Sequence, residues 1–237
     1  MARITLVPET GSTNADMAAL AGQGWDEGHW LRAGRQTAGR GRLGREWQSH
    51  EGNLQASTLI RLRPSDPPVA GLGLLVGVAL HEALTSLAPD AGIALKWPND
   101  LTTGPAKLAG ILLERLGDAV IVGVGVNVAN APQIEGRSTI SLAELPGGVG
   151  IDAATLSESL AARFDHWLAR WRAEGFAPVR MAWLGAAHPI GTRFVVHPGT
   201  ESHLEGGFEG VAEDGALLLR LGDGTLQVIH SGDVGFL

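Results

Sequence analysis

The sequence predicts a protein of mixed helices and strands, followed by a small all-β module at its C-terminal end. Two observations lead to this prediction. Residues 152–185 repeat apolar side chains at three- and four-residue spacing, which is typical of a helix with one buried face. After a cluster of glycines and a proline around 185–191, short apolar runs alternate with Pro-Gly, Gly-Gly and Asp-Gly turn signals, as in an SH3-like barrel.

The first part of the chain alternates predicted strands and helices. Pro67 and Pro68 mark the start of a long helix, because proline is favoured in the first helical turn. Gly117 and Asp118 separate two apolar runs and predict a hairpin turn between them. The expected strands cover 3–7, 30–33, 54–62, 93–97, 107–115, 119–128, 193–197, 204–211, 216–221 and 225–229, and the expected helical regions cover 13–21, 67–87 and 152–185.

Composition excludes several classes of protein. The 237 residues are 44% apolar, which is enough for one core and a small second domain. The absence of cysteine excludes disulfides and cysteine-rich zinc sites, and a net charge of −7 argues against a general nucleic-acid surface. The apolar stretch 69–80 is too short to span a membrane, so it predicts a buried helix. No signal peptide is recognised, and we expect a cytoplasmic protein.

The stretch AGRGRLGREW at 38–47 contains the glycine spacing of dinucleotide-binding and kinase loops. The context of those loops is missing, because REWQSHEGN follows without helical periodicity and no kinase signature V-A-I-K or H-R-D is present. The stretch therefore predicts a mobile loop whose arginines bind a carboxylate or phosphate, with Trp47 available to stack on a planar base. A solvated surface loop is the alternative.

Only two of the eighteen basic residues are lysines, and both fall in stretches that resemble binding sites. Lys96 lies in LKWPNDL, and Lys107 lies in AKLAGILLE at the mouth of an apolar strand that contains Gly110. A compact ammonium is harder to replace by arginine where it faces a phosphate or carboxylate. The alternative for Lys96 is an ordinary ion pair with Asp100.

Five stretches together resemble biotin–protein ligases: STN at 12–14, GRGRLGREW at 39–47, KWPNDL at 96–101, KLAGILLE at 107–114 and GVGVN at 123–127. They occur in the order and spacing of that family, over nearly the whole chain. The resemblance implies an α+β fold, with a mixed, largely antiparallel sheet related to class II aminoacyl-tRNA synthetases over 1–187 and an SH3-like β domain over 188–237. It implies that ATP and Mg²⁺ activate biotin as biotinyl-5'-AMP, and that biotin is then transferred to a lysine of a biotin carboxyl carrier protein.

The resemblance also implies site residues. The expected biotin-binding residues are Ser12, Thr13, Asn14, Gln36, Arg40, Gly41, Arg42, Lys107 and Gly110. The expected ATP- or adenylate-binding residues are Arg42, Arg45, Trp47, Lys96, Asn99, Lys107 and Asn127. The expected catalytic residues are Lys107, Arg40, Arg42 and Asp100, and Asp100 is also the candidate ligand for Mg²⁺.

Two positions depart from the family pattern. Gln55 in NLQ stands where the family usually has an aromatic residue, so one wall of the biotin pocket is unassigned. The C-terminal SGDVGFL lacks the basic residue that some members place near adenine. Because the ligase motifs begin near residue 1, without the DNA-binding domain of some members, we expect no DNA partner. The short apolar stretch 69–80 leads us to expect no membrane partner.

Two other functions stay open on the sequence. A lipoate or octanoate ligase would share the fold but would need an apolar tunnel in place of Ser12, Thr13 and Gln36. The second alternative is a non-enzymatic module that binds RNA through the arginine loop. The acidic net charge and the lack of aromatic side chains on which bases could stack argue against this function.

Overall fold

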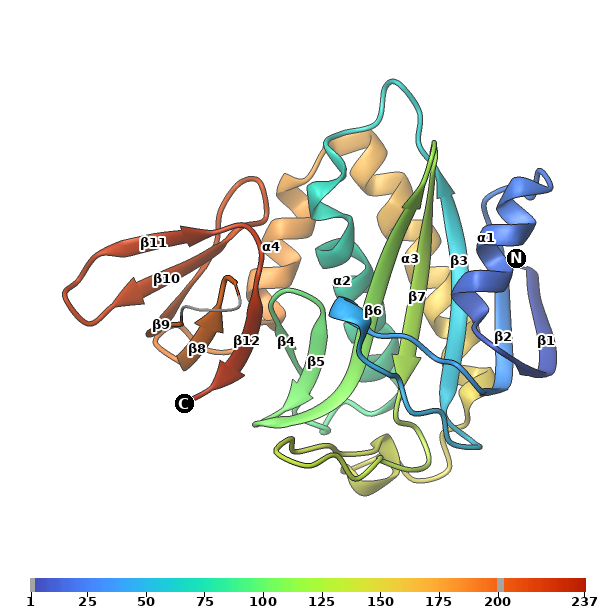
Figure 1. Ribbon diagram of the computed structural model, residues 1–237, viewed down its shortest axis with the longest axis horizontal. Coiled ribbons are helices and arrows are strands. Elements are labelled where there is room, and N and C mark those ends of the chain that lie inside the picture. Colours follow the sequence, from blue (N-terminus) through green and yellow to red (C-terminus); the bar gives the residue numbers. More distant parts are fainter. Residues whose placement is uncertain (1–2, 200–202) are drawn as a thin grey trace.

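A computed structural model describes residues 3–199 and 203–237 and arranges them around two β-sheets (Figure 1). The larger sheet has seven strands in the order β1-β2-β3-β7-β6-β5-β4. Only the β1–β2 pair is parallel, so the α+β class with a largely antiparallel sheet is confirmed. The strands are β1 (Arg3–Thr10), β2 (His29–Gln36), β3 (Leu54–Arg61), β4 (Ala94–Lys96), β5 (Asp100–Thr103), β6 (Ala106–Leu116) and β7 (Ala119–Val126).

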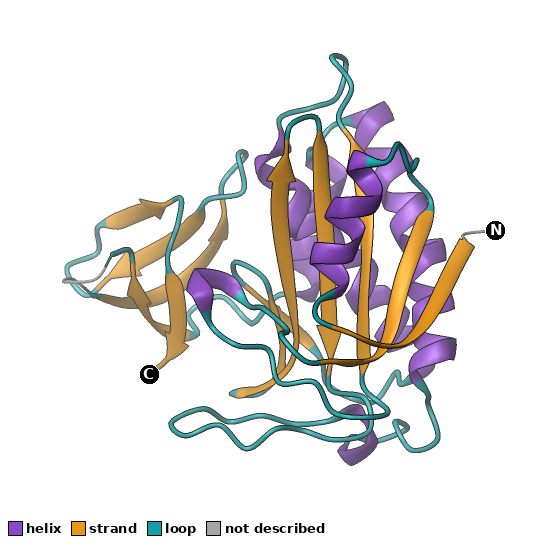
Figure 2. Cartoon of the chain, turned by 45° about the vertical axis from the view of Figure 1, so that its right-hand side comes forward, coloured by secondary structure: helices purple, strands orange, loops and turns teal. Residues whose placement is uncertain are grey.

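Helices cover both faces of this sheet (Figure 2). The helix α1 (Thr13–Gly22) packs over β3 and β7 on one face, around Met17 and Leu59. The helices α2 (Leu72–Leu87) and α3 (Ala153–Glu174) pack on the opposite face and build the main core. The helix α4 (Ala177–Ala186) follows α3 and contacts α2. Short 3₁₀ turns cover Arg42–Gly44, Val69–Gly71 and Leu142–Glu144.

The sequence of each core helix explains its position. Ten of the sixteen residues of α2 are buried, which confirms the prediction of a buried helix. The expectation that this segment is too short to span a membrane is wrong on length alone, because the helical segment Val69–Leu87 has 19 residues and is apolar enough to cross one. Asp152 caps α3 by accepting a hydrogen bond from the backbone N–H of Thr155 at 2.7 Å. Gly175, at φ +81°, ends α3, so the helical region expected over 152–185 consists of two helices.

The second sheet lies beside the first and contains five antiparallel strands in the order β11-β10-β9-β8-β12. Its size and antiparallel pairing are consistent with the expected SH3-like unit. The strands are β8 (Arg193–His197), β9 (Leu204–Val211), β10 (Leu217–Leu221), β11 (Leu226–Ile229) and β12 (Asp233–Phe236). The sequence did not predict β5 or β12, and both strands border the site described next.

Candidate active site

A cavity of about 440 Å³ lies on the α1 face of the large sheet. Its walls come from the start of α1, the end of β2, the loop 37–53, strands β4 to β7, the segment 132–139 after β7 and the final strand β12. All fifteen residues that the sequence predicted for the site line this one cavity. Stretches separated by more than a hundred residues of chain therefore meet in space.

Glycines form the floor of the cavity. One row of the sheet runs across four strands through Gln55, Gly125, Gly110 and Asp100, which pair directly with one another. The indole of Trp47 lies over the two glycines: a Cβ on Gly110 would be 3.3 Å from Trp47 Cζ3, and one on Gly125 would collide with the ring. The absence of side chains at these two positions therefore allows the indole to lie close to the sheet.

The end of the cavity near α1 is lined by polar side chains without a formal charge, beside the Arg40–Glu114 ion pair. The backbone N–H and the hydroxyl of Thr13 both donate hydrogen bonds to Gln36 Oε1, at 2.8 and 3.0 Å. Ser57 Oγ lies 2.7 Å from Thr13 Oγ1 and from Asn14 Oδ1. Asn14 Nδ2 in turn donates to Glu114 at 2.7 Å. These bonds fix the buried side chains of the first helical turn, where backbone N–H groups lack helical partners.

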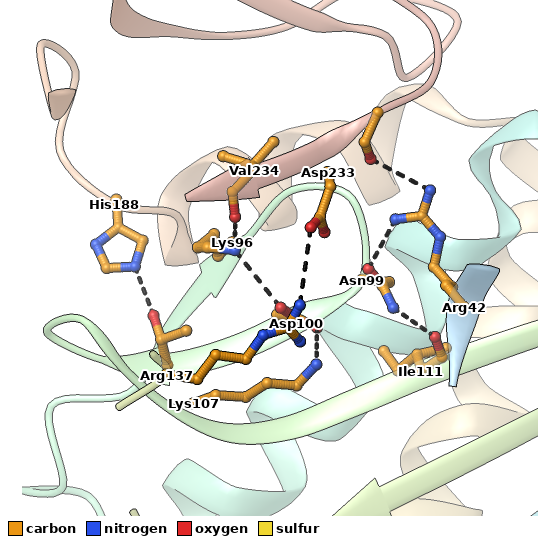
Figure 3. Close-up of polar contacts among 12 residues, drawn as sticks. Arg42, Lys96, Asn99, Asp100, Lys107, Ile111, Arg137, His188, Asp233 and Val234 are labelled. Carbon is orange, nitrogen blue, oxygen red and sulfur yellow. Dashed lines mark hydrogen bonds and ion pairs between the residues drawn. The ribbon is translucent and has the colours of Figure 1, made fainter. Parts of the chain in front are cut away.

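The opposite end carries the two lysines. Asp100 lies between them, with Oδ1 2.6 Å from Lys107 Nζ and Oδ2 3.5 Å from Lys96 Nζ (Figure 3). Lys96 is buried and also donates to the carbonyl oxygen of Val234 at 2.6 Å. Burial lowers the pKa of the Lys96 ammonium below its usual value, although Asp100 opposes that shift. Lys107 is partly exposed, and its Nζ lies 5.8 Å from the centre of the Trp47 ring.

The arginine loop folds over the cavity and reaches the second sheet. Arg42 donates to Asn99 Oδ1 at 3.1 Å and to the carbonyl oxygen of Gly232 at 3.3 Å (Figure 3). Arg45 forms an ion pair with Asp233 at 2.6 Å, and this contact holds the pKa of the Asp233 carboxyl below its usual value. Arg40 pairs with Glu114 at 3.3 Å. The loop is thus tied to both sheets, while its mobility stays a prediction.

Sequence reasoning missed the contribution of β12. Asp233, Val234 and Phe236 line the cavity, and Gly232 and Val234 supply carbonyl oxygens to Arg42 and Lys96. The strand is short, and it pairs with β8, which lies more than thirty residues earlier in the chain. No local pattern in SGDVGFL signals that pairing.

The residues around Asp100 do not form a metal site on their own. No group of three or more His, Cys, Asp or Glu side chains with metal-binding geometry occurs within 3–199 and 203–237. Both oxygens of Asp100 already face an ammonium group. Mg²⁺ in ATP-using enzymes is commonly held by one or two carboxylates together with phosphate oxygens, so Asp100 stays a candidate ligand only for Mg²⁺ that is bound to nucleotide.

Comparison with known proteins agrees with this geometry. A profile of the Biotin/lipoate A/B protein ligase family matches residues 10–127, and a profile of the biotin protein ligase C-terminal domain matches residues 199–237. A biotin–[acetyl-CoA-carboxylase] ligase of Paracoccus denitrificans is 39% identical and covers 98% of this chain and 99% of its own length. The chain belongs to the biotin protein ligase family.

Other members of the family are similar over most of the chain. The bifunctional ligase/repressor of Escherichia coli is 32% identical, over 98% of this chain and 73% of its own. The structure of the Aquifex aeolicus ligase in complex with biotin and ATP superposes with a TM-score of 0.84 at 27% identity, covering 100% of this chain and 99% of that one. The Leishmania major ligase, solved with biotinyl-5-AMP, gives a TM-score of 0.70 at 25% identity, covering 96% and 98%.

Proposed function

We propose that this chain is an ATP-dependent ligase that activates biotin as biotinyl-5'-AMP and transfers it to a lysine of a biotin carboxyl carrier protein. One observation carries the proposal: a single cavity joins an uncharged hydrogen-bonding end to a cationic end over a floor of glycines. Biotin has the complementary shape, with a neutral polar ring at one end and a carboxylate at the other. Relatives named as biotin ligases over the full chain support this assignment.

The uncharged end is the proposed binding site for the biotin ring. Ser12, Thr13, Asn14 and Gln36 present hydroxyl, amide and backbone groups there without a formal charge. The cyclic urea of biotin offers two N–H donors and one carbonyl acceptor to such groups. Gly110 lines the cavity beside Lys107 and Trp47, so we assign the hydrocarbon tail to this stretch, with the carboxylate pointing toward Lys107.

The cationic end is the proposed site of adenylate formation. An oxygen of the biotin carboxylate attacks the α-phosphorus of ATP, the bond to the bridging oxygen breaks, and pyrophosphate leaves. Because two anions meet in this step, the main requirement is positive charge at the meeting point. Lys107 faces the cavity there, and Arg42 reaches it from the loop. Arg40 also lines the cavity from the loop, and its guanidinium is paired with Glu114 in this structure.

The nucleotide is assigned to five other residues that line the cavity. Trp47 offers an aromatic face, Asn99 and Asn127 offer amides, and Arg45 and Lys96 add positive charge. When Mg²⁺ is bound to ATP, it neutralises phosphate charge, and Asp100 is the carboxylate of this cavity that is placed to join it. The folded loop also excludes water, which would otherwise hydrolyse the mixed anhydride.

The second step joins biotin to the carrier. The neutral amine of the carrier lysine attacks the acyl carbon of the adenylate, AMP leaves, and the nitrogen loses a proton as the amide forms. Asp100 is the proposed group that attracts the incoming ammonium, because it is a carboxylate that lines the cavity next to Lys107; the incoming lysine would have to replace part of its present pairing with Lys96 and Lys107. No cysteine, serine or histidine nucleophile is needed for either step.

Three further assignments belong to this proposal. Residues 1–187 form the catalytic domain and 188–237 form the second domain, which contributes β12 to the site. The protein partner is the biotin carboxyl carrier protein of acetyl-CoA carboxylase or of a similar carboxylase, as the names of the relatives suggest. The protein works in the cytoplasm, where ATP is available, and the absence of cysteine is compatible with that reducing compartment.

Mass analysis of a carrier domain tests the function. The purified chain, incubated with biotin, Mg²⁺–ATP and a biotin carboxyl carrier domain, should add one biotinyl group to a single lysine. A carrier domain with that lysine replaced by arginine should stay unmodified. An unmodified wild-type carrier, or modification only when lipoate or octanoate replaces biotin, would contradict the proposal.

A further inference from the structure

Gln55 is a buried amide that the proposed reaction does not yet use. It lies in β3, is 1% exposed, and neither of its amide atoms has a hydrogen-bond partner within the described part of the chain. Buried polar groups are nearly always paired, so two unpaired atoms on one side chain need an explanation.

The sheet register places Gln55 on the cavity face. Its direct neighbours on the two adjoining strands are Ala33 and Gly125, and neither has a side chain that can bond an amide. Ser57, two residues along the same strand and therefore on the same face, is engaged with Thr13 and Asn14. Gln55 is therefore next to the lining residue Gly125 and to the Trp47 indole that covers it, directly behind the lining of the cavity.

Other unpaired polar atoms gather around the same part of the floor. The indole nitrogen of Trp47 is buried and has no partner among the residues that the structure describes, and it lies close to Gly125, the neighbour of Gln55. Asn127 directly follows β7, two residues beyond Gly125, and its Oδ1 is also buried with no partner among residues 3–199 and 203–237. A ligand with hydrogen-bonding atoms can satisfy such groups, whereas a hydrocarbon chain leaves them unpaired.

We propose that Gln55 determines substrate specificity by hydrogen bonding to the urea-bearing ring of biotin. The inference rests on the proposed function. It gives a role to Gln55, which stands at the wall of the biotin pocket where the family usually has an aromatic residue. The N–H groups of the Gln55 amide can donate to the carbonyl oxygen of a cyclic urea, and the Gln55 carbonyl oxygen can accept from a urea N–H group. Lipoate has the same pentanoate tail but a dithiolane ring without N–H or C=O groups, so it would bury the amide unpaired.

The test exchanges the amide for an apolar side chain of similar size. For Gln55→Met and Gln55→Leu, kcat/KM for biotin in ATP–pyrophosphate exchange should fall about tenfold or more, while the value for lipoate should stay constant or rise. The Tm of the ligand-free variants should not fall, because an unsatisfied amide has been removed. A purely structural role predicts the reverse: a lower Tm and an unchanged preference for biotin.

Thr58→Val is the matched control on the same strand. Thr58 faces the opposite side, and its hydroxyl donates to the carbonyl oxygen of His29 at 2.6 Å, so this variant should lower the Tm without changing the ratio of biotin to lipoate. An unchanged ratio, or a lower Tm, in both Gln55 variants would overturn the inference. Failure of the proposed function is a separate result, because the wild-type chain would then show no biotin-dependent exchange.

Discussion

Lys107 reaches the cavity from β6 and contacts both Asp100 and the face of Trp47. Replacing it with alanine should reduce biotin-dependent ATP–pyrophosphate exchange by roughly 30- to 1,000-fold, equivalent to about 2–4 kcal/mol of transition-state stabilisation. The fold should survive, because the Lys107 side chain is partly exposed and its removal leaves Asp100 paired with Lys96.

The matched control for this prediction is Arg115→Ala on the same strand. Arg115 is exposed, lies outside the cavity and donates only to the carbonyl oxygen of Gly117 at 3.1 Å. Exchange by the control should equal that of the wild type. Similar exchange rates for Lys107→Ala and Arg115→Ala would show that Lys107 does not stabilise the reaction.

At the level of secondary-structure elements, β12 links the arginine loop to the second sheet. Asp233→Asn removes the ion pair with Arg45 while leaving the backbone carbonyls of Gly232 and Val234 in place. The pair is partly exposed and worth about 0.5–1 kcal/mol, so release of preformed biotinyl-adenylate should accelerate by roughly two- to fivefold. Stopped-flow measurement of that release rate is the test.

Glu209→Gln provides the comparison for the β12 prediction. It removes an ion pair with Arg220, at 2.8 Å, between β9 and β10 of the same sheet and away from the cavity. Adenylate release should then match the wild type. Equal rates in wild type, Asp233→Asn and Glu209→Gln would mean that the Arg45–Asp233 contact does not hold the loop closed.

At the level of the whole molecule, His188 joins the two sheets. Its Nε2 lies 2.7 Å from Thr102 Oγ1, and its ring packs 5.0 Å from that of Phe236. Burial and the Lys96 charge lower the pKa of His188 below its usual value of 6.5. The unfolded state therefore binds more protons near and below that pH, so the free energy of unfolding should decrease as the pH falls through about 6.5.

Urea unfolding at pH 7.5 and 5.5 measures this dependence. The His188→Gln variant keeps a hydrogen-bonding group toward Thr102 but cannot take up the proton, so it should lose less stability than the wild type between the two pH values. An equal loss in both proteins would show that protonation of His188 does not weaken the contact between the sheets.

A feature of this structure can be predicted from the sequence when its signal lies within one short stretch of residues. The helical stripe of α3 and the hairpin at Gly117 are visible because three- and four-residue spacing and turn residues lie within one short window. Gln55 and Asp233 are not visible in this way. Their surroundings depend on strands and loops that lie far away in the chain, such as Gly125 for Gln55 and Arg45 for Asp233.

ATP–pyrophosphate exchange tests the central claim most directly, because it reports adenylate formation without any carrier protein. The purified chain, with Mg²⁺–ATP and labelled pyrophosphate, should incorporate label into ATP only when biotin is added. Lipoate and octanoate should support little exchange at the same concentration. Exchange that is absent with biotin, or equally fast with all three acids, would contradict the assignment of this cavity to biotin activation.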